Sequence, residues 1–245
     1  MARASTLERL IDYAEDQWGL VTRRQALSAG VPASTLRRLV TDGRAIKPVA
    51  HGVYRVGGAP PPDHESLRAA WLQLAPDVPA WERGAANGVV SHRSAAEMYG
   101  IGHFAEERHE FTLARRRQSK RPDVRLHRRR LTDAEWIVLR GLPVTRPARI
   151  ASDLLYDGED AAGVAHLIGD ALRGVYDYPG TVAEALAPHA SSFGLRRNDG
   201  VALLDWMLDL VGEPEITFWI DEARAHQTRV AAVEIAPSRF GAEIR

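Results

Sequence analysis

Between residues 20 and 43, the spacing of apolar and polar side chains predicts two short helices. The first follows Thr22, because Thr22-x-x-Gln25 has the spacing of a capping box, and it ends at Gly30. The second follows Pro32 and ends at Gly43. Its apolar positions recur at helical spacing and form one narrow stripe, made by Leu36, Leu39 and Val40.

A hairpin and a preceding helix complete this region. Two short apolar runs at residues 46–49 and 53–56 are predicted strands, joined by a glycine-containing connection at residues 50–52. Upstream, residues 6–18 place apolar side chains on one side of a helix that ends at Gly19. This order of elements is that of a winged helix-turn-helix, whose second short helix enters the major groove of DNA. We therefore expect residues 1–58 to form a DNA-binding domain.

The outward face of the helix at residues 32–42 carries the side chains expected to read base edges. At about 100° per residue, hydroxyl and guanidinium groups lie opposite the apolar stripe, and such groups bond to bases in the major groove. The residues expected to enter the groove are Ser34, Thr35, Arg37, Arg38 and Thr41. Further residues are expected to contact phosphates or, at the wing tip, the minor groove: Arg23, Arg24, Lys47, Arg55 and His51.

The rest of the chain predicts a second domain. Glycine and proline at residues 57–62 predict a linker, so the second domain would span residues 63–245. Segments beginning at His109, Val124 and Trp136 predict short strands, the last with a hairpin turn at Arg140-Gly141. Helices are predicted later at residues 147–156, 159–175, 181–187 and 199–211.

The pentapeptide beginning at Ile216 predicts a strand, and residues 222–235 fit neither the helix pattern nor the strand pattern clearly. The expected fold class is therefore α+β. An N-terminal winged helix would be followed by a mixed α/β domain with a small sheet and several C-terminal helices.

Charge is distributed unevenly along a chain whose net charge is zero. Residues 1–60 hold 9 basic against 5 acidic residues, residues 61–150 hold 16 against 11, and residues 151–245 hold 7 against 16. The basic N-terminal part and the acidic C-terminal part are predicted to have different partners. There is no cysteine, no secretory signal pattern and no apolar run approaching the ~20 residues of a membrane span, so we expect a cytoplasmic protein.

The motifs of common enzyme classes are missing from the sequence. A restriction-type nuclease needs an acidic residue two positions before a lysine, but Ala45 precedes Lys47 and Gln118 precedes Lys120. The nine histidines form no His-Glu-x-x-His pair, and no glycine-rich loop carries a phosphate-binding lysine. Ser91-His92 has the residue types of a hydrolase site, but a serine before a helix is usually a cap. We expect no enzymatic activity, no cofactor and no metal.

The densest run of positive charge lies between residues 115 and 130, where Asp123 is the only opposing charge. Three interpretations stay open for this run. It is a solvated face of a β-hairpin, a second nucleic-acid surface that adds phosphate contacts, or a docking site for an acidic partner. The basic residues concerned are Arg115, Arg116, Arg117, Lys120, Arg121, Arg125, Arg128, Arg129 and Arg130.

The order of several segments resembles that of actinobacterial AbiEi-family antitoxins. The segments are HGVYRVGGAP, VVSHRSAAEMYGI, VRLHRRR and GLPVTRPARIASDLL, and the resemblance covers roughly residues 8–211. It implies a winged helix that represses its own operon by binding double-stranded promoter DNA, where inverted repeats are expected. It also implies a second domain that counters, directly or functionally, the nucleotidyltransferase-like toxin of a type IV toxin–antitoxin pair.

The sequence departs from the family pattern at the wing tip, where Ala50 and His51 replace the frequent arginine. Two other functions stay open. One is a winged-helix transcription factor whose second domain senses a small ligand. The other is a protein-interaction module that does not bind DNA.

Overall fold

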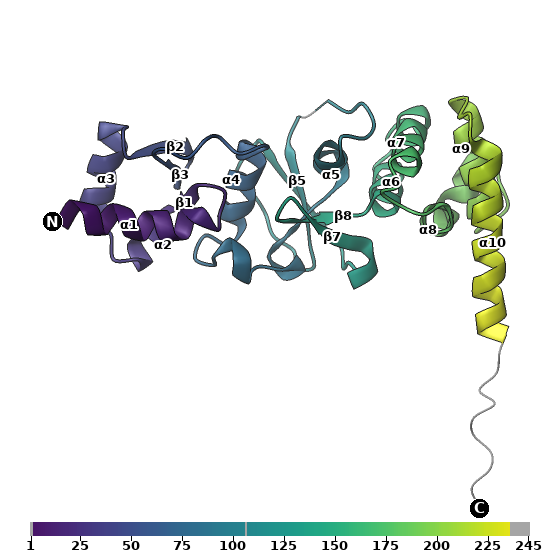
Figure 1. Cartoon of the computed structure of the whole chain (residues 1–245). Helices are drawn as coiled ribbons and strands as arrows, with labels where there is room; N and C mark the ends of the chain where they lie inside the picture. The colour runs from purple at the N-terminus through teal and green to yellow at the C-terminus, as the bar shows by residue number, and fades with distance from the viewer. Residues whose placement is uncertain (1, 106, 236–245) are drawn as a thin grey trace, which may run out of the picture. The chain divides into compact units, whose positions relative to one another are not determined.

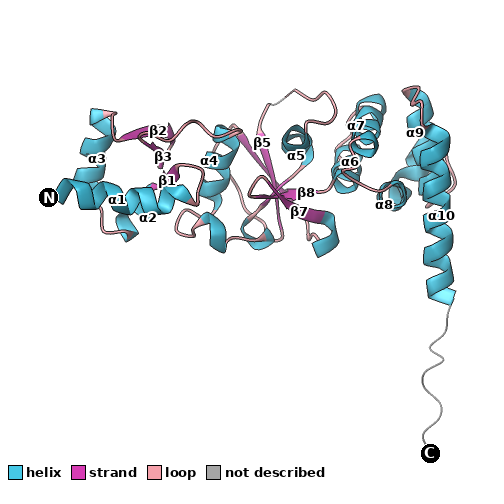
Figure 2. Cartoon of the chain, viewed as in Figure 1, coloured by secondary structure: helices cyan, strands magenta, loops and turns pink. Residues whose placement is uncertain are grey.

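The computed structural model describes residues 2–105 and 107–235 of the chain (Figure 1). Its internal contacts divide the chain into two compact units. Unit 1 comprises residues 1–94 and 106–144, and unit 2 comprises residues 95–105 and 145–245. Helices predominate and the strands are short (Figure 2), which confirms the α+β class. The expected linker at residues 57–62 lies inside unit 1, so the division differs from the expected one.

Unit 1 begins with three helices and a three-stranded sheet. The helices are α1 (Ala2–Glu15), α2 (Arg23–Ser28) and α3 (Ala33–Asp42), and the strands are β1 (Leu20–Thr22), β2 (Ile46–Ala50) and β3 (Val53–Val56). The central strand β3 pairs antiparallel with both β1 and β2. Apolar side chains of the helices and strands share one buried core, which includes Leu10, Val21, Leu36 and Ile46. This is the predicted winged helix.

Two local features differ from the prediction. The first helix ends at Glu15 and not at Trp18, because Trp18 and Gly19 both adopt left-handed backbone angles, with φ of 57° and 78°. The Gly19 amide donates to the Ala14 carbonyl (2.8 Å), which turns the chain into β1. The strand β1 was not predicted, since three residues that are all buried show no alternation.

Helix α4 (Glu65–Leu74) packs against the strands of the winged helix. Trp71 of this helix is buried, and its ring meets the Trp18 ring edge-on, with the centroids 6.0 Å apart. The Arg68 guanidinium lies 4.3 Å from the centre of the Trp18 ring, and the Arg83 guanidinium lies 4.6 Å from that of Trp71. Edge-on aromatic pairs and cations over ring faces are both attractive, so these four side chains join α4 to the winged helix.

A buried polar network also connects the winged helix to the residues that follow α4. Gln17 and Gln25 exchange two amide hydrogen bonds of 2.9 and 3.0 Å. The Gln17 carbonyl oxygen also accepts from the Ala80 amide (2.9 Å), and the Gln25 side chain donates to the Val78 carbonyl (3.2 Å). The Thr22 hydroxyl donates to the Pro76 carbonyl (2.5 Å). Residues 76–80 are therefore hydrogen-bonded to Gln17, Thr22 and Gln25 of the winged helix, and this is why residues 1–58 do not stand apart as a unit.

The remainder of unit 1 is built on a five-stranded sheet. Its strands are β4 (Val89–Val90), β5 (His109–Leu113), β6 (Val124–Arg128), β7 (Trp136–Leu139) and β8 (Leu142–Thr145), in the order β6-β5-β4-β8-β7. Short 3-10 helices at Ala80–Glu82 and Ala85–Asn87 precede β4 in the chain, and a third at Asp133–Glu135 lies between β6 and β7. The predicted turn between β7 and β8 is confirmed, since Arg140 and Gly141 have the positive φ angles of a tight hairpin turn.

The β-hairpin interpretation of residues 115–130 is wrong. Strands β5 and β6 pair in parallel, with His109 opposite Val124 and Leu113 opposite Arg128. Parallel neighbours need a connection that carries the chain back along the sheet. Residues 114–123 make this return, and we call them the crossover loop.

Unit 2 is helical within its described residues. Helix α5 (His92–Tyr99) crosses the unit boundary, and the later helices are α6 (Pro147–Tyr156), α7 (Ala161–Arg173), α8 (Pro179–Leu186), α9 (Gly200–Leu210) and α10 (Ile216–Ile235), with a 3-10 helix at Ala187–Phe193. Helix α8 packs against α6, α9 and α10. Gly200 permits the close approach of α9, because a Cβ there would lie 1.8 Å from the Ala183 carbonyl oxygen.

The predicted strand at Ile216 is wrong, because these residues begin α10. Aromatic and β-branched residues favour strands locally, but Ile220 and Ala223 are buried three positions apart, as on one face of a helix. No helix in the described part of the chain is both long and apolar enough to cross a membrane.

Removal of the Arg83 guanidinium should destabilise unit 1. This group donates to the carbonyls of Val78, Trp71 and Leu72 at 2.8–2.9 Å, and also to that of Ala75. Burial lowers the pKa of Arg83 to about 10, so it is still charged at neutral pH. We expect Arg83→Ala to lower the free energy of unfolding by about 2–3 kcal/mol in urea titrations, because the carbonyls lose charged donors. Arg116→Ala, at an exposed position, is the control; equal stability of the two variants would contradict this role.

Candidate nucleic-acid interface

The turn between α2 and α3 is specified by local hydrogen bonds. The Gln25 amide donates to the Thr22 hydroxyl (3.1 Å), and the Thr22 amide donates to the Gln25 side chain (2.9 Å), so the predicted capping box is confirmed. Gly30 has the positive φ of 80° expected where α2 is followed by a turn. Gly43 ends α3 with a φ of 66°, and its amide donates to the Leu39 carbonyl.

Helix α3 buries one stripe and exposes the other. Leu36 is only 2% exposed, and Leu39 and Val40 pack beside it on the core of the winged helix. Of the predicted groove-entering residues, four are exposed and Thr35 is half-buried; the exposed ones are Ser34, Arg37, Arg38 and Thr41. The Thr41 hydroxyl donates to the Arg37 carbonyl (3.0 Å), so it is oriented by its own helix. The face opposite the core therefore offers two guanidinium groups and hydroxyls to a ligand.

The two predicted wing cations differ in their surroundings. Lys47 on β2 and Arg55 on β3 are register partners, and Lys47 is exposed. Arg55 is half-buried, and its guanidinium forms an ion pair of 2.7 Å with Glu65 at the start of α4. Lys47 is thus available to a phosphate, whereas Arg55 is already neutralised by a carboxylate.

The wing tip and the start of α2 lie close to residues far away in the sequence. His51 is exposed, and its carbonyl accepts a hydrogen bond from the Gln73 side chain on α4. Arg23 and Arg24 are both exposed, and Arg24 pairs with Asp77 at 2.7 Å. That pair is itself exposed, and exposed pairs contribute little energy, so Arg24 can exchange Asp77 for a phosphate at small cost.

The basic residues between positions 115 and 130 differ in their surroundings. Arg115, Arg116 and Lys120 lie in the crossover loop and are exposed. By contrast, Arg117 donates to the Leu74 carbonyl of α4, and Arg121 forms a two-bond ion pair with Asp123. Arg125, Arg128 and Arg130 are exposed and Arg129 is half-buried, on β6 or just beyond it.

One cleft brings the two predicted basic sets together. It has a volume of about 480 Å³ and is lined on one side by Arg23, Arg24 and His51. On the other side it is lined by crossover-loop residues, which include Arg117, Lys120 and Arg121. The structure therefore places part of the Arg-dense run beside the wing, a proximity that the sequence did not reveal.

A buried polar cluster formed by residues of β5, β6 and the start of α5 was not predicted from the sequence. The Glu110 carboxylate lies 2.6 Å from the His127 ring, which stacks on the His92 ring with centroids 3.5 Å apart. Burial alone would raise the pKa of Glu110, but the His127 hydrogen bond and the positive charge of nearby histidines and Arg125 hold it below its usual value. In sequence, Glu110 is the acidic residue of the strand His109–Leu113 and directly precedes the apolar Phe111, and that was the available signal.

The Ser91–His92 pair belongs to this cluster. The Ser91 hydroxyl lies 2.9 Å from the His92 ring nitrogen and accepts a hydrogen bond from the Thr112 hydroxyl (2.9 Å). Ser91 is fully buried and His92 is 3% exposed. A nucleophile needs an approach for its substrate, and this hydroxyl has none. The geometry favours a structural role.

Comparison with known proteins supports the predicted resemblance. Residues 8–57 match the family model described as a transcriptional regulator, AbiEi antitoxin. The matched segment is the winged helix described above. Over these residues, the match supports a DNA-binding regulator of the antitoxin type. No curated protein matches the chain.

A solved structure shows a related fold. The chain is similar to the crystal structure of the Rv2827c protein from Mycobacterium tuberculosis, with a TM-score of 0.51 and 18% sequence identity. The similarity covers 87% of this chain and 79% of the other. It therefore extends beyond the winged helix, and at this identity it concerns the fold alone.

Lys47 is exposed and Arg55 is paired with Glu65, so alanine variants of the two residues should differ in their effects. For binding to double-stranded DNA, Lys47→Ala should make the slope of log affinity against log salt shallower by about one, because one phosphate contact is lost. Arg55→Ala should leave that slope unchanged but lower the free energy of unfolding by about 1 kcal/mol, because Glu65 loses its partner. Fluorescence anisotropy at several salt concentrations and urea titration measure the two effects. The reverse assignment of effects would show that Arg55 is the phosphate contact.

Proposed function

We propose that this protein is a sequence-specific repressor that binds the promoter of its own operon and serves as the antitoxin of a toxin–antitoxin pair. The observation that carries the first part is the exposed face of α3, which holds Arg37, Arg38, Ser34 and Thr41 opposite the buried stripe. A helix of this kind, followed directly by a wing, is the arrangement that reads a major groove.

Each group on the interface has a role that its chemistry allows. Arg37 and Arg38 can form paired hydrogen bonds to guanine, and Ser34, Thr35 and Thr41 can bond to either strand's base edges. Lys47, Arg23 and Arg24 would hold phosphates, and His51 would contact the backbone or the minor groove at the wing tip. Arg55 would act indirectly, because its ion pair with Glu65 fixes β3 against α4.

A two-fold repeated operator would suit this interface. A single winged helix contacts a few base pairs, so repressors of this kind usually occupy two half-sites about one helical turn apart. We therefore expect inverted repeats in the promoter upstream of this gene. The place of action would be the cytoplasm, where that DNA lies.

The antitoxin role is assigned to unit 2, in which acidic residues predominate. Its helices α9 and α10 expose large apolar side chains, which are Trp206 (40%), Leu210 (47%) and Phe218 (58%). Asp205 and Asp209 are exposed on the same helix as Trp206 and Leu210. Exposed aromatic residues flanked by carboxylates suit a protein partner with a basic surface. We propose a nucleotidyltransferase-like toxin as that partner, in line with the family resemblance.

The DNA-binding proposal is tested at Arg38. Arg38→Ala should weaken operator binding by about 1–3 kcal/mol and relax the preference at one base pair, because a paired contact to a base is lost. Affinity for a promoter fragment and for its single-base variants is measured by fluorescence anisotropy. Arg224→Ala on α10 removes an equal charge from the acidic unit and is the control. If Arg38→Ala binds every fragment as the parent protein does, α3 is not the recognition helix.

The division of labour is tested in the full-length chain. Arg37→Ala/Arg38→Ala should abolish repression of a promoter reporter but still rescue growth when co-expressed with the neighbouring toxin gene. Trp206→Ala/Leu210→Ala should repress normally and rescue poorly, because the apolar contact with the toxin is lost. Rescue that depends on α3 and not on α9 would reject unit 2 as the antitoxin part and leave the DNA-binding proposal to its own test.

A further inference from the structure

The cleft between the wing and the crossover loop is not needed for base reading by α3. Its two sides come from residues far apart in the sequence, with Arg23 and His51 on one side and Lys120 on the other. Its lining also includes apolar side chains of α4 and β6, namely Ala70, Leu74, Val124 and Leu126. The cleft therefore combines positive charge with apolar surface.

Both sides of the cleft are attached to helix α4. The Gln73 side chain donates to the carbonyl of His51, which holds the wing tip. Arg117 donates to the carbonyl of Leu74, one residue further along the same helix, which holds the crossover loop. A helix end has carbonyls without intrahelical partners, so Arg117 finds an acceptor there that favours a positive charge. The cleft is thus formed before any ligand arrives.

The positive charge of the cleft is only partly neutralised. Arg24 pairs with Asp77, and Arg121 pairs with Asp123. Among the described residues, Arg23 and Lys120 have no acidic partner, and both are exposed. A ligand in this cleft would therefore bring negative charge to Arg23 and Lys120 and place an apolar part against the α4 and β6 side chains.

We propose that this cleft binds the sugar–phosphate backbone of duplex DNA beside the base pairs read by α3. A DNA strand has both required features, since its phosphates are anionic and its deoxyribose rings offer apolar faces. The inference rests on the proposed DNA-binding function and adds a second contact region to it. Such contacts position a protein on DNA and increase affinity without reading sequence.

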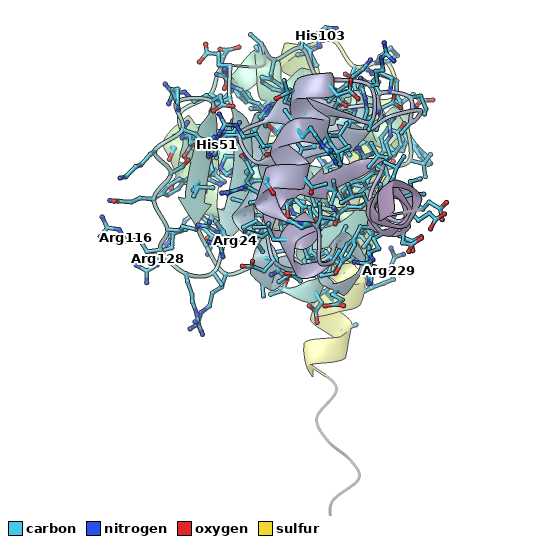
Figure 3. All side chains as sticks on the ribbon, turned by 90° about the vertical axis from the view of Figure 1, so that its left-hand side faces the viewer. Arg24, His51, His103, Arg116, Arg128 and Arg229 are labelled. Atoms are coloured by element: carbon cyan, nitrogen blue, oxygen red, sulfur yellow. The ribbon has the colours of Figure 1, made fainter. Side chains whose placement is uncertain are left out.

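The cations continue beyond the cleft, and this favours a polyanion over a small anionic ligand. In Figure 3, Arg24, His51, Arg116 and Arg128 lie on the same flank of the molecule. Arg116 and Arg128 are exposed, and among the described residues neither has an ion pair. A small phosphate compound would leave these outer groups unused, whereas a DNA strand passes along them.

Charge reversal at Lys120 tests the inference in the full-length protein. Two duplexes are used, the operator alone and the operator extended by about ten base pairs on each side. The parent protein should bind the extended duplex more tightly than the short one. Lys120→Glu should lose roughly tenfold in affinity for the extended duplex and show a salt slope shallower by about one or more, with unchanged base preference. Arg197→Glu, an exposed arginine of unit 2, is the matched control and should bind as the parent does.

Several outcomes would overturn the inference. One is that Lys120→Glu binds both duplexes as tightly as the parent protein does. A second is that Lys120→Glu lowers the affinity for an RNA hairpin more than the affinity for DNA. A third is that a free nucleotide alone binds the cleft saturably. Failure of the parent to prefer its promoter would count against the proposed repressor function instead. In that case the salt slope on an unrelated duplex, compared between Lys120→Glu and Arg197→Glu, still decides whether the cleft binds DNA.

Discussion

The arrangement of unit 1 depends on the packing of Trp71 against Trp18, which attaches α4 to the winged helix. The two indoles meet edge-on, and a guanidinium covers each of them, Arg68 on Trp18 and Arg83 on Trp71. Both arginines also donate hydrogen bonds to backbone carbonyls, which compensate for the water that the guanidinium groups lose on burial beside the two indoles. Because α4 is fixed to the winged helix in this way, the wing tip and the crossover loop have a defined separation. A flexible linker at residues 57–62 would have given no such cleft.

The elements that the sequence predicted well are those with local causes. The capping box at Thr22 and Gln25 and the left-handed glycine at Gly43 act within a few residues, so α2 and α3 were placed correctly. The parallel pairing of β5 with β6 depends on contacts across the sheet, and nothing in the two strands alone distinguishes it from a hairpin. The helical period also predicted the exposed face of α3, apart from the half-buried Thr35. The cleft was not predicted, because it depends on the fold of residues 63–144.

The number of basic residues overstates the charge available to a ligand. Arg68 and Arg83 have their guanidinium groups directed at backbone carbonyls, and burial lowers the pKa of each to about 10. Arg55 is paired with Glu65, and Arg149 donates to the buried Asp153. These residues stabilise the fold, whereas the exposed ones on α3, the wing and the crossover loop face solvent. A sequence count cannot separate the two groups, because the separation depends on which carbonyls and carboxylates lie within reach.

The opposite charges of the two regions have a consequence for specificity. Residues 151–245 carry a surplus of acidic residues that balances the basic surplus of residues 1–150. A protein of zero net charge gains little from long-range attraction to DNA at physiological salt, where the Debye length is about 8 Å. In the proposed complex, affinity must then come from cations within a few ångströms of phosphates, and the proposed groups are Arg23, Lys47, Lys120 and the α3 arginines. Without long-range attraction to DNA of any sequence, a larger share of the affinity of the proposed complex would come from short-range contacts, which include the base contacts proposed for α3.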